Sequence, residues 1–161
     1  MGKLTIIALR VVIALCLVGS LFVQVVLVPL FWVDLEGEAL WGRITLVVII
    51  VLGIMTMQVS AICIWQLLSM VRKGSVFSNA AFRYVDVVFG AVATASVLFF
   101  ILAAVLAPGG TAPGIVGLIG GLGLAVAGVA LVVLVLRMLL EQALAREVEA
   151  EHLRSELDEV I

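Results

Sequence analysis

The chain has 161 residues, of which 65% are hydrophobic and 12% are charged, and its mean hydropathy is +1.40. A water-soluble domain carries about 25% charged and about 45–50% apolar residues. The composition therefore excludes a water-soluble protein and predicts an all-α integral membrane protein, since backbone polar groups in lipid must pair within their own helix.

Four apolar stretches are each long enough to cross a bilayer, which takes about 20 residues. They run from about residue 11 to 32, 44 to 71, 84 to 106 and 115 to 140. The last two are separated by residues 107–114, which include two prolines and three glycines and do not continue a helix cheaply. These stretches predict a four-helix transmembrane bundle over residues 1–140 and a tail over residues 141–161.

The start of the chain also has one property of a secretory signal, because Lys3 precedes an apolar run. Arg10 interrupts that run, and no A-x-A cleavage site follows it. We therefore expect the first span to be retained in the membrane rather than cleaved.

Basic residues are distributed unevenly between the two sides of the predicted bundle. Eight of the nine Lys and Arg residues lie before the first span, in the second connection or at and beyond the end of the fourth span. The other side has only Arg43, together with Asp34, Glu36 and Glu38. Because Lys and Arg are enriched in cytoplasmic segments, the distribution predicts that both termini face the cytoplasm.

The sequence contains no motif of a known enzyme or cofactor site. It lacks H-E-x-x-H, C-x-x-C, G-x-S-x-G and P-loop patterns. Cys16 and Cys63 fall in the cytoplasmic halves of the first two spans, where two thiols without a histidine make a poor metal site. We expect no catalysis, no cofactor, no metal and no direct nucleic-acid binding.

A few polar side chains interrupt the first two spans: Gln24, Thr56, Gln58 and Ser60. Hydrogen bonds between membrane helices contribute about 0.6–2 kcal/mol each and commonly hold helices together. We expect that structural role. The alternative is a small channel or transporter subunit in which these groups line a solute path and the glycine-rich fourth span assembles the oligomer.

Four charged residues lie at the predicted cytoplasmic helix ends: Arg10, Arg83, Asp86 and Arg137. Arginine side chains in such positions extend to the interface. Asp86 follows Arg83 by three residues, a spacing that allows a local ion pair. We expect a charge cluster at the membrane edge that locks the helix ends together; an ion or proton site at Asp86 stays open as an alternative.

Small residues recur at every fourth position of the fourth span, at Gly117, Gly121 and Ala125, and the face is widened by Gly114, Gly120, Gly123 and Gly128. Such a face allows another helix backbone to approach closely. We expect it to pack inside the four-helix bundle. Homo-oligomerisation through this face and a flexible gating helix are the two alternatives.

The tail is predicted to continue the fourth helix into water, because from Glu141 onward it has no Gly or Pro and is rich in Ala, Leu, Glu and Arg. Seven of the eleven acidic residues lie in it, against only Arg146 and Arg154. Steps of four and three, typical of a heptad seam, connect Leu139, Ala143, Arg146, Ala150, Leu153, Leu157 and Val160.

A leucine seam flanked by carboxylates suits a basic protein partner in the cytoplasm. The residues expected to bind that partner are Leu153, Leu157, Asp158, Glu159, Val160 and Ile161. A solvated extension without a partner, or pairing with another tail, are the alternatives.

Two short motifs resemble a known family. Residues 72–78, RKGSVFS, resemble an R-x-G-x-x-F-[ST] loop, and residues 153–161, LRSELDEVI, resemble an acidic E-L-D-x-x-I terminus. Both are found in a bacterial four-span family called domain of unknown function 2975, and span order and length fit this family over essentially the whole chain. The resemblance implies a bacterial cytoplasmic membrane, little chemistry and, as a candidate partner, a small helix-turn-helix regulator encoded nearby. A membrane immunity protein against a toxin is a third alternative that no residue pattern favours.

Overall fold

The computed structural model describes residues 3–37, 39–72 and 79–160, and this part of the chain contains helices and no β-strand. The elements are α1 (Lys3–Phe22), η1 (Val23–Leu27), α2 (Val28–Asp34), α3 (Leu40–Arg72), α4 (Asn79–Leu106) and α5 (Pro113–Val160). Residues 73–78, which include most of the RKGSVFS motif, and Ile161 lie outside the described residues.

Among the described residues, four helices are long and apolar enough to cross a membrane. They are Leu4–Asp34, Leu40–Met70, Ala81–Leu106 and a segment within Pro113–Ser155. This confirms the prediction of an all-α chain with four helices of membrane-spanning length and composition. The helices are longer than the apolar stretches that predicted them, because polar end turns continue the same hydrogen-bonded ladder.

The first of these helices contains a π-helical turn, η1, that connects α1 to α2. Pro29 in the first turn of α2 has no backbone N–H, and its ring displaces the carbonyl four residues earlier. The backbone N–H of Val28 donates to the Val23 carbonyl, five residues back, which is the spacing of a π-helix. Pro29 was a visible signal for this irregularity, but no break in the first span was predicted from it.

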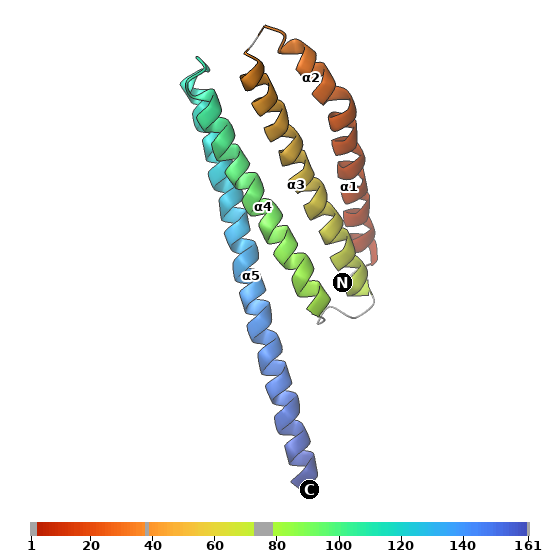
Figure 1. Cartoon of the computed structure of the whole chain (residues 1–161). Helices are drawn as coiled ribbons and strands as arrows, with labels where there is room; N and C mark the ends of the chain where they lie inside the picture. The colour runs from red at the N-terminus through yellow and green to blue at the C-terminus, as the bar shows by residue number, and fades with distance from the viewer. Residues whose placement is uncertain (1–2, 38, 73–78, 161) are drawn as a thin grey trace.

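The turn between α4 and α5 has the chemistry that its sequence predicts. The N–H of Gly109 donates to the Leu106 carbonyl at 3.1 Å, which closes the end of α4. Gly110 has a φ of +74°, a conformation that residues with a Cβ rarely adopt. Pro113 then begins α5, where its fixed φ suits the first helical turn. The sharp reversal places α4 and α5 side by side and antiparallel (Figure 1).

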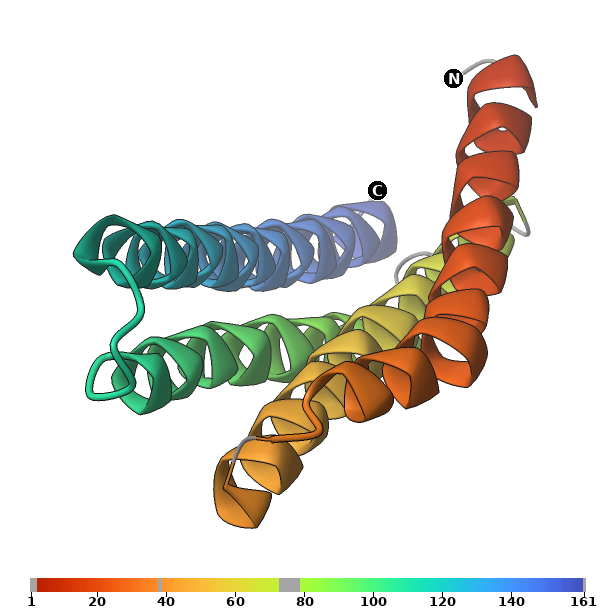
Figure 2. The same ribbon diagram turned by 90° about the horizontal axis from the view of Figure 1, so that it is seen from above.

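The helices form an open row rather than a closed bundle. The extensive contacts are those between α3 and α4 and between α4 and α5, with smaller contacts between α3 and the α1–α2 helix. The α1 and α5 helices lie at the two ends of the row (Figures 1 and 2). Lipid can cover the outer faces of such a row, because an apolar helix face is as stable against lipid as against another apolar helix.

The closest packing in the row is between α4 and α5. A Cβ at Gly123 would come within 3.1 Å of the Phe99 Cβ. At the same level the buried Ser96 donates a hydrogen bond of 2.8 Å to the Gly123 carbonyl. Two turns further along α5, Ala130 is only 4% exposed. Small side chains on α5 therefore let the two backbones approach and let a serine reach across.

We predict that Gly123→Val destabilises the fold, because the added methyl groups enter space that Phe99 occupies; overpacking of this kind costs about 1–3 kcal/mol. Gly120→Val is the matched control, since a Cβ at Gly120 meets nothing within 4 Å and both changes carry the same helix-propensity cost. The measurement is the midpoint of thermal unfolding in one detergent. Equal midpoints for the two variants would contradict this packing.

Candidate functional site

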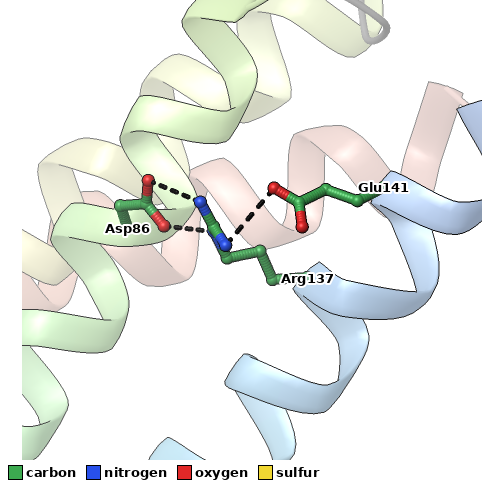
Figure 3. A network of polar contacts seen from close by, with 3 residues as sticks. All are labelled: Asp86, Arg137 and Glu141. Carbon is green, nitrogen blue, oxygen red and sulfur yellow. Dashed lines mark hydrogen bonds and ion pairs between the residues drawn. The ribbon is translucent and has the colours of Figure 1, made fainter. Parts of the chain in front are cut away.

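An ion-pair network joins α4 to α5 near the end of the row where α5 extends furthest (Figure 3). The guanidinium of Arg137 forms an ion pair with Asp86, and its Nη2 donates to Asp86 Oδ2 at 3.1 Å. Its Nη1 lies 3.3 Å from Glu141 Oε1, one turn further along α5. One arginine therefore bridges a carboxylate on each helix, which fixes the lengthwise register of α5 against α4.

A second arginine, Arg10, joins the N-terminal part of α1 to the C-terminal part of α3. Arg10 Nη2 donates to Ser69 Oγ at 2.9 Å, and the guanidinium carbon lies 5.3 Å from the centre of the Trp65 ring. Ser69 in turn donates to the Trp65 carbonyl at 3.1 Å. The arginine binds here through a hydroxyl and an aromatic face rather than through a carboxylate.

The predicted cluster of four charged residues is thus two separate contacts. Asp86 and Arg137 are brought together, as part of the expected lock between helix ends. Arg10 contacts α3 instead, at the other side of the row. Arg83 is exposed and forms no ion pair within the described residues, so the local pair with Asp86 expected from their spacing is replaced by the pair with Arg137.

At the opposite end of the row, Arg43 holds the first connection together. Its guanidinium donates to the Trp32 carbonyl and lies 4.1 Å from the centre of the Trp32 ring. Glu36 Oε1 is 3.9 Å from Arg43 Nη2. In the sequence, Arg43 counted only toward the charge of its side of the bundle. The pairing of a lone arginine with an interfacial tryptophan across a short loop could have indicated this contact.

Three polar side chains meet between the first membrane helix and α3: Ser20 from α1, Gln24 from η1 and Gln58 from α3. Gln58 Nε2 donates to Gln24 Oε1 at 2.9 Å and to Ser20 Oγ at 3.1 Å. Ser20 is only 8% exposed and donates to the Leu17 carbonyl at 2.8 Å. The expected structural role of these amides is therefore matched by direct contacts between them.

The other polar groups of α3 are satisfied within their own helix. Thr56 donates to the Gly53 carbonyl at 2.7 Å, and Ser60 donates to the Thr56 carbonyl at 2.9 Å. Neither hydroxyl forms a hydrogen bond with Gln24 or Gln58 within the described residues. A channel or transporter role remains an untested prediction.

The small-residue face of the fourth span does not pack as expected. Gly117, Gly121 and Ala125 are all exposed, and a Cβ added at either glycine would meet nothing within 4 Å. The contact with α4 is made by Gly123 instead, about 200° around the helix from Gly121. The four-residue repeat identified a face suited to close approach, but the neighbour within this chain lies on the other side.

The predicted partner-binding residues lie at the far end of α5. Leu153 is 54% exposed, and its neighbours Glu149 and Arg154 are exposed as well. Leu157, Asp158, Glu159 and Val160 belong to the last turns of α5, but their side chains lie outside the described part, as does Ile161 entirely.

The thiols singled out in the sequence are free, with Cys16 exposed and Cys63 buried. In the described part of the chain, no three His, Cys, Asp or Glu side chains are grouped to hold a metal ion.

We predict that Asp86→Asn weakens the fold by about 0.5–1 kcal/mol, a modest amount because both partners are partly exposed to solvent. Arg137→Gln should cost a similar amount, and the double variant little more than either one. The measurement is the unfolding midpoint in detergent for the complete double-mutant cycle. Strictly additive losses would show that Asp86 and Arg137 do not interact.

Replacing the bridging amide should also be measurable. Gln58→Leu removes the hydrogen bonds from α3 to Ser20 of α1 and to Gln24 of η1, with an expected loss of about 0.6 kcal/mol and at most about 1.7 kcal/mol. Gln66→Leu is the control, because Gln66 is an exposed glutamine of the same helix that makes no hydrogen bond within the described residues. If both leucine variants unfold at the same temperature, the amide bridge contributes nothing.

Comparison with known proteins assigns the chain to a family. Residues 34–161 match the model of a family described as "Protein of unknown function (DUF2975)". The match includes α3, α4 and α5, whereas the resemblance was expected over essentially the whole chain. No curated protein and no solved structure matches the chain. With four apolar helices and a matched range that covers most of its length, the chain belongs to the DUF2975 family.

Proposed function

We propose that this chain is a non-enzymatic protein of a bacterial cytoplasmic membrane that binds a basic cytoplasmic protein through the end of α5. A small helix-turn-helix regulator is the candidate partner, because DNA-binding proteins carry basic surfaces. The role of the membrane helices is then to hold a docking helix at the membrane surface.

The observation that carries the proposal is the length of α5. Its 48 residues correspond to about 72 Å, against a hydrocarbon core of about 30 Å. Figure 1 shows α5 continuing well beyond the ends of the other helices. Every described side chain from Ala145 to Ser155 is exposed. The helix thus presents a long surface that no other part of the described chain covers.

The charge of this surface favours a basic partner over an anionic lipid surface. Residues 141–161 hold seven carboxylates and two arginines, so anionic lipid headgroups are repelled. A basic protein is attracted at long range by the same charges. Such attraction is screened by salt, which gives the interaction a recognisable signature.

The proposed orientation, with both termini in the cytoplasm, is supported by the positions of the chain termini. The N-terminus and the extension of α5 lie at the same end of the row (Figure 1). Arg10, Arg83 and Arg137 belong to that end, in agreement with the enrichment of basic residues on the cytoplasmic side.

The test uses the full chain in lipid nanodiscs, with the candidate regulator from the same cell as the probe. We expect binding that weakens as salt is raised, disappears when residues 153–161 are deleted and falls several-fold in Glu147→Gln/Glu149→Gln, because charge attraction is lost. Arg154→Gln is the control, since it makes the tail more acidic and should not weaken binding. If deletion of residues 153–161 left the bound cytoplasmic proteins unchanged, the proposal would be wrong.

A further inference from the structure

The α5 helix has two opposite faces along most of its length. Residues with restricted exposure recur every three or four positions, from Val116 through Gly123, Ala130 and Arg137 to Leu144. This face packs against α4 and includes the Ser96 hydrogen bond and the Asp86 ion pair. The helix is thus held against its own chain along one side only.

The opposite face is exposed and continuous from the membrane into the tail. In an α-helix, residues 18 positions apart point in the same direction, because 18 residues make about five turns. Gly117, Val135 and Leu153 are related in this way, and so are Gly121 and Leu139. All five are exposed. The small-residue face of the membrane part and the heptad seam of the tail are therefore one stripe, which we call the free face of α5.

The free face runs from the bilayer into water, so whatever covers it must be stable in lipid along one part and in water along the other. Lipid can cover Gly117 and Gly121 but not Leu153, which is 54% exposed and belongs to the C-terminal part of α5. The C-terminal end of α5 continues beyond the ends of the other helices (Figure 1). A water-soluble protein can cover Leu153 but cannot follow the stripe into the bilayer. A matching helix must carry small residues inside the bilayer and a leucine seam beyond it. The α5 helix of a second copy has this pattern at the same depth.

Each tail is net acidic, with seven carboxylates against two arginines, so a second tail fits only in a register where these arginines meet carboxylates across the seam. Two copies inserted the same way bring their α5 helices together in parallel. In a parallel pair with Ala143, Ala150 and Leu153 in the seam, Glu149 and Arg154 occupy the g and e positions that face each other across the two helices. Arg146 lies in the seam beside Glu147 of the second copy. Both arginines of the tail thereby meet a carboxylate of the opposite helix.

We infer that the protein forms a parallel homodimer through the free face of α5, with small residues in contact within the membrane and a short coiled coil beyond it. Small residues allow close backbone approach in lipid, and beyond the membrane the seam removes Leu153 from water. The inference does not depend on the proposed partner. In the dimer Leu153 is shared between the two tails, and Glu147 and Glu149, at the flanks of the seam, meet the arginines of the second copy while their solvent-facing sides stay open to a basic protein.

Disulfide cross-linking of purified protein in lipid vesicles tests the pairing without any partner present. In a Cys16→Ala/Cys63→Ala background, Val135→Cys, Leu139→Cys and Leu153→Cys should each give a covalent dimer on mild oxidation. Leu122→Cys and Val148→Cys are matched controls, because these side chains are 48% and 65% exposed but point away from the free face. The inference is overturned if Leu139→Cys and Leu153→Cys cross-link no more than the controls do.

A charge exchange tests the parallel register. Glu149→Arg or Arg154→Glu alone should lower the yield of the Leu139→Cys dimer about two- to fivefold, the range expected for an exposed ion pair. The double variant Glu149→Arg/Arg154→Glu should restore the yield, because the two charges are then exchanged across the seam. A double variant that cross-links no better than the single variants would exclude this register. Loss of partner binding without loss of cross-linking would count against the proposed function alone.

Discussion

Lipid gives a membrane helix neither hydrogen bonds for its backbone nor a hydrophobic gain from packing against another apolar helix. The first condition makes every span of this chain helical. The second leaves helix association to close backbone approach and to a few polar contacts. Gly123 supplies the close approach between α4 and α5, and Ser96 uses it to reach the glycine carbonyl. The rest of the arrangement depends on contacts of these two kinds.

The open row follows from where the chain offers such contacts. Polar groups join the first membrane helix to α3, in the interior through Gln24 of η1 and Gln58 and at one end through Arg10 of α1 and Ser69. The pair of Asp86 and Arg137 joins α4 to α5. No comparable contact joins α1 to α5 in the described part of the chain, and these two helices remain at opposite ends. The free face of α5 is a direct result, and its heptad continuation makes it a surface for assembly.

Much of this could be predicted from the sequence. The four spans follow from composition and length, and the turn before Pro113 follows from its prolines and glycines. Other features were visible but were given the wrong meaning or none. The repeat of Gly117, Gly121 and Ala125 indicated a face for helix contact, while Gly123, expected only to widen that face, makes the contact with α4. Pro29 carried the signal for the π-helical turn.

The sequence by itself determined which segments are helices and which of them carry polar groups, because these properties depend on each segment and its solvent. It could not determine which side of α5 meets α4 or that Arg137 rather than Arg83 pairs with Asp86. Those choices depend on how two helices approach each other across the turn at residues 107–112. Only the tertiary structure decided them, because several faces of these helices are almost equally apolar. The sequence alone therefore does not distinguish the face that packs against a neighbouring helix.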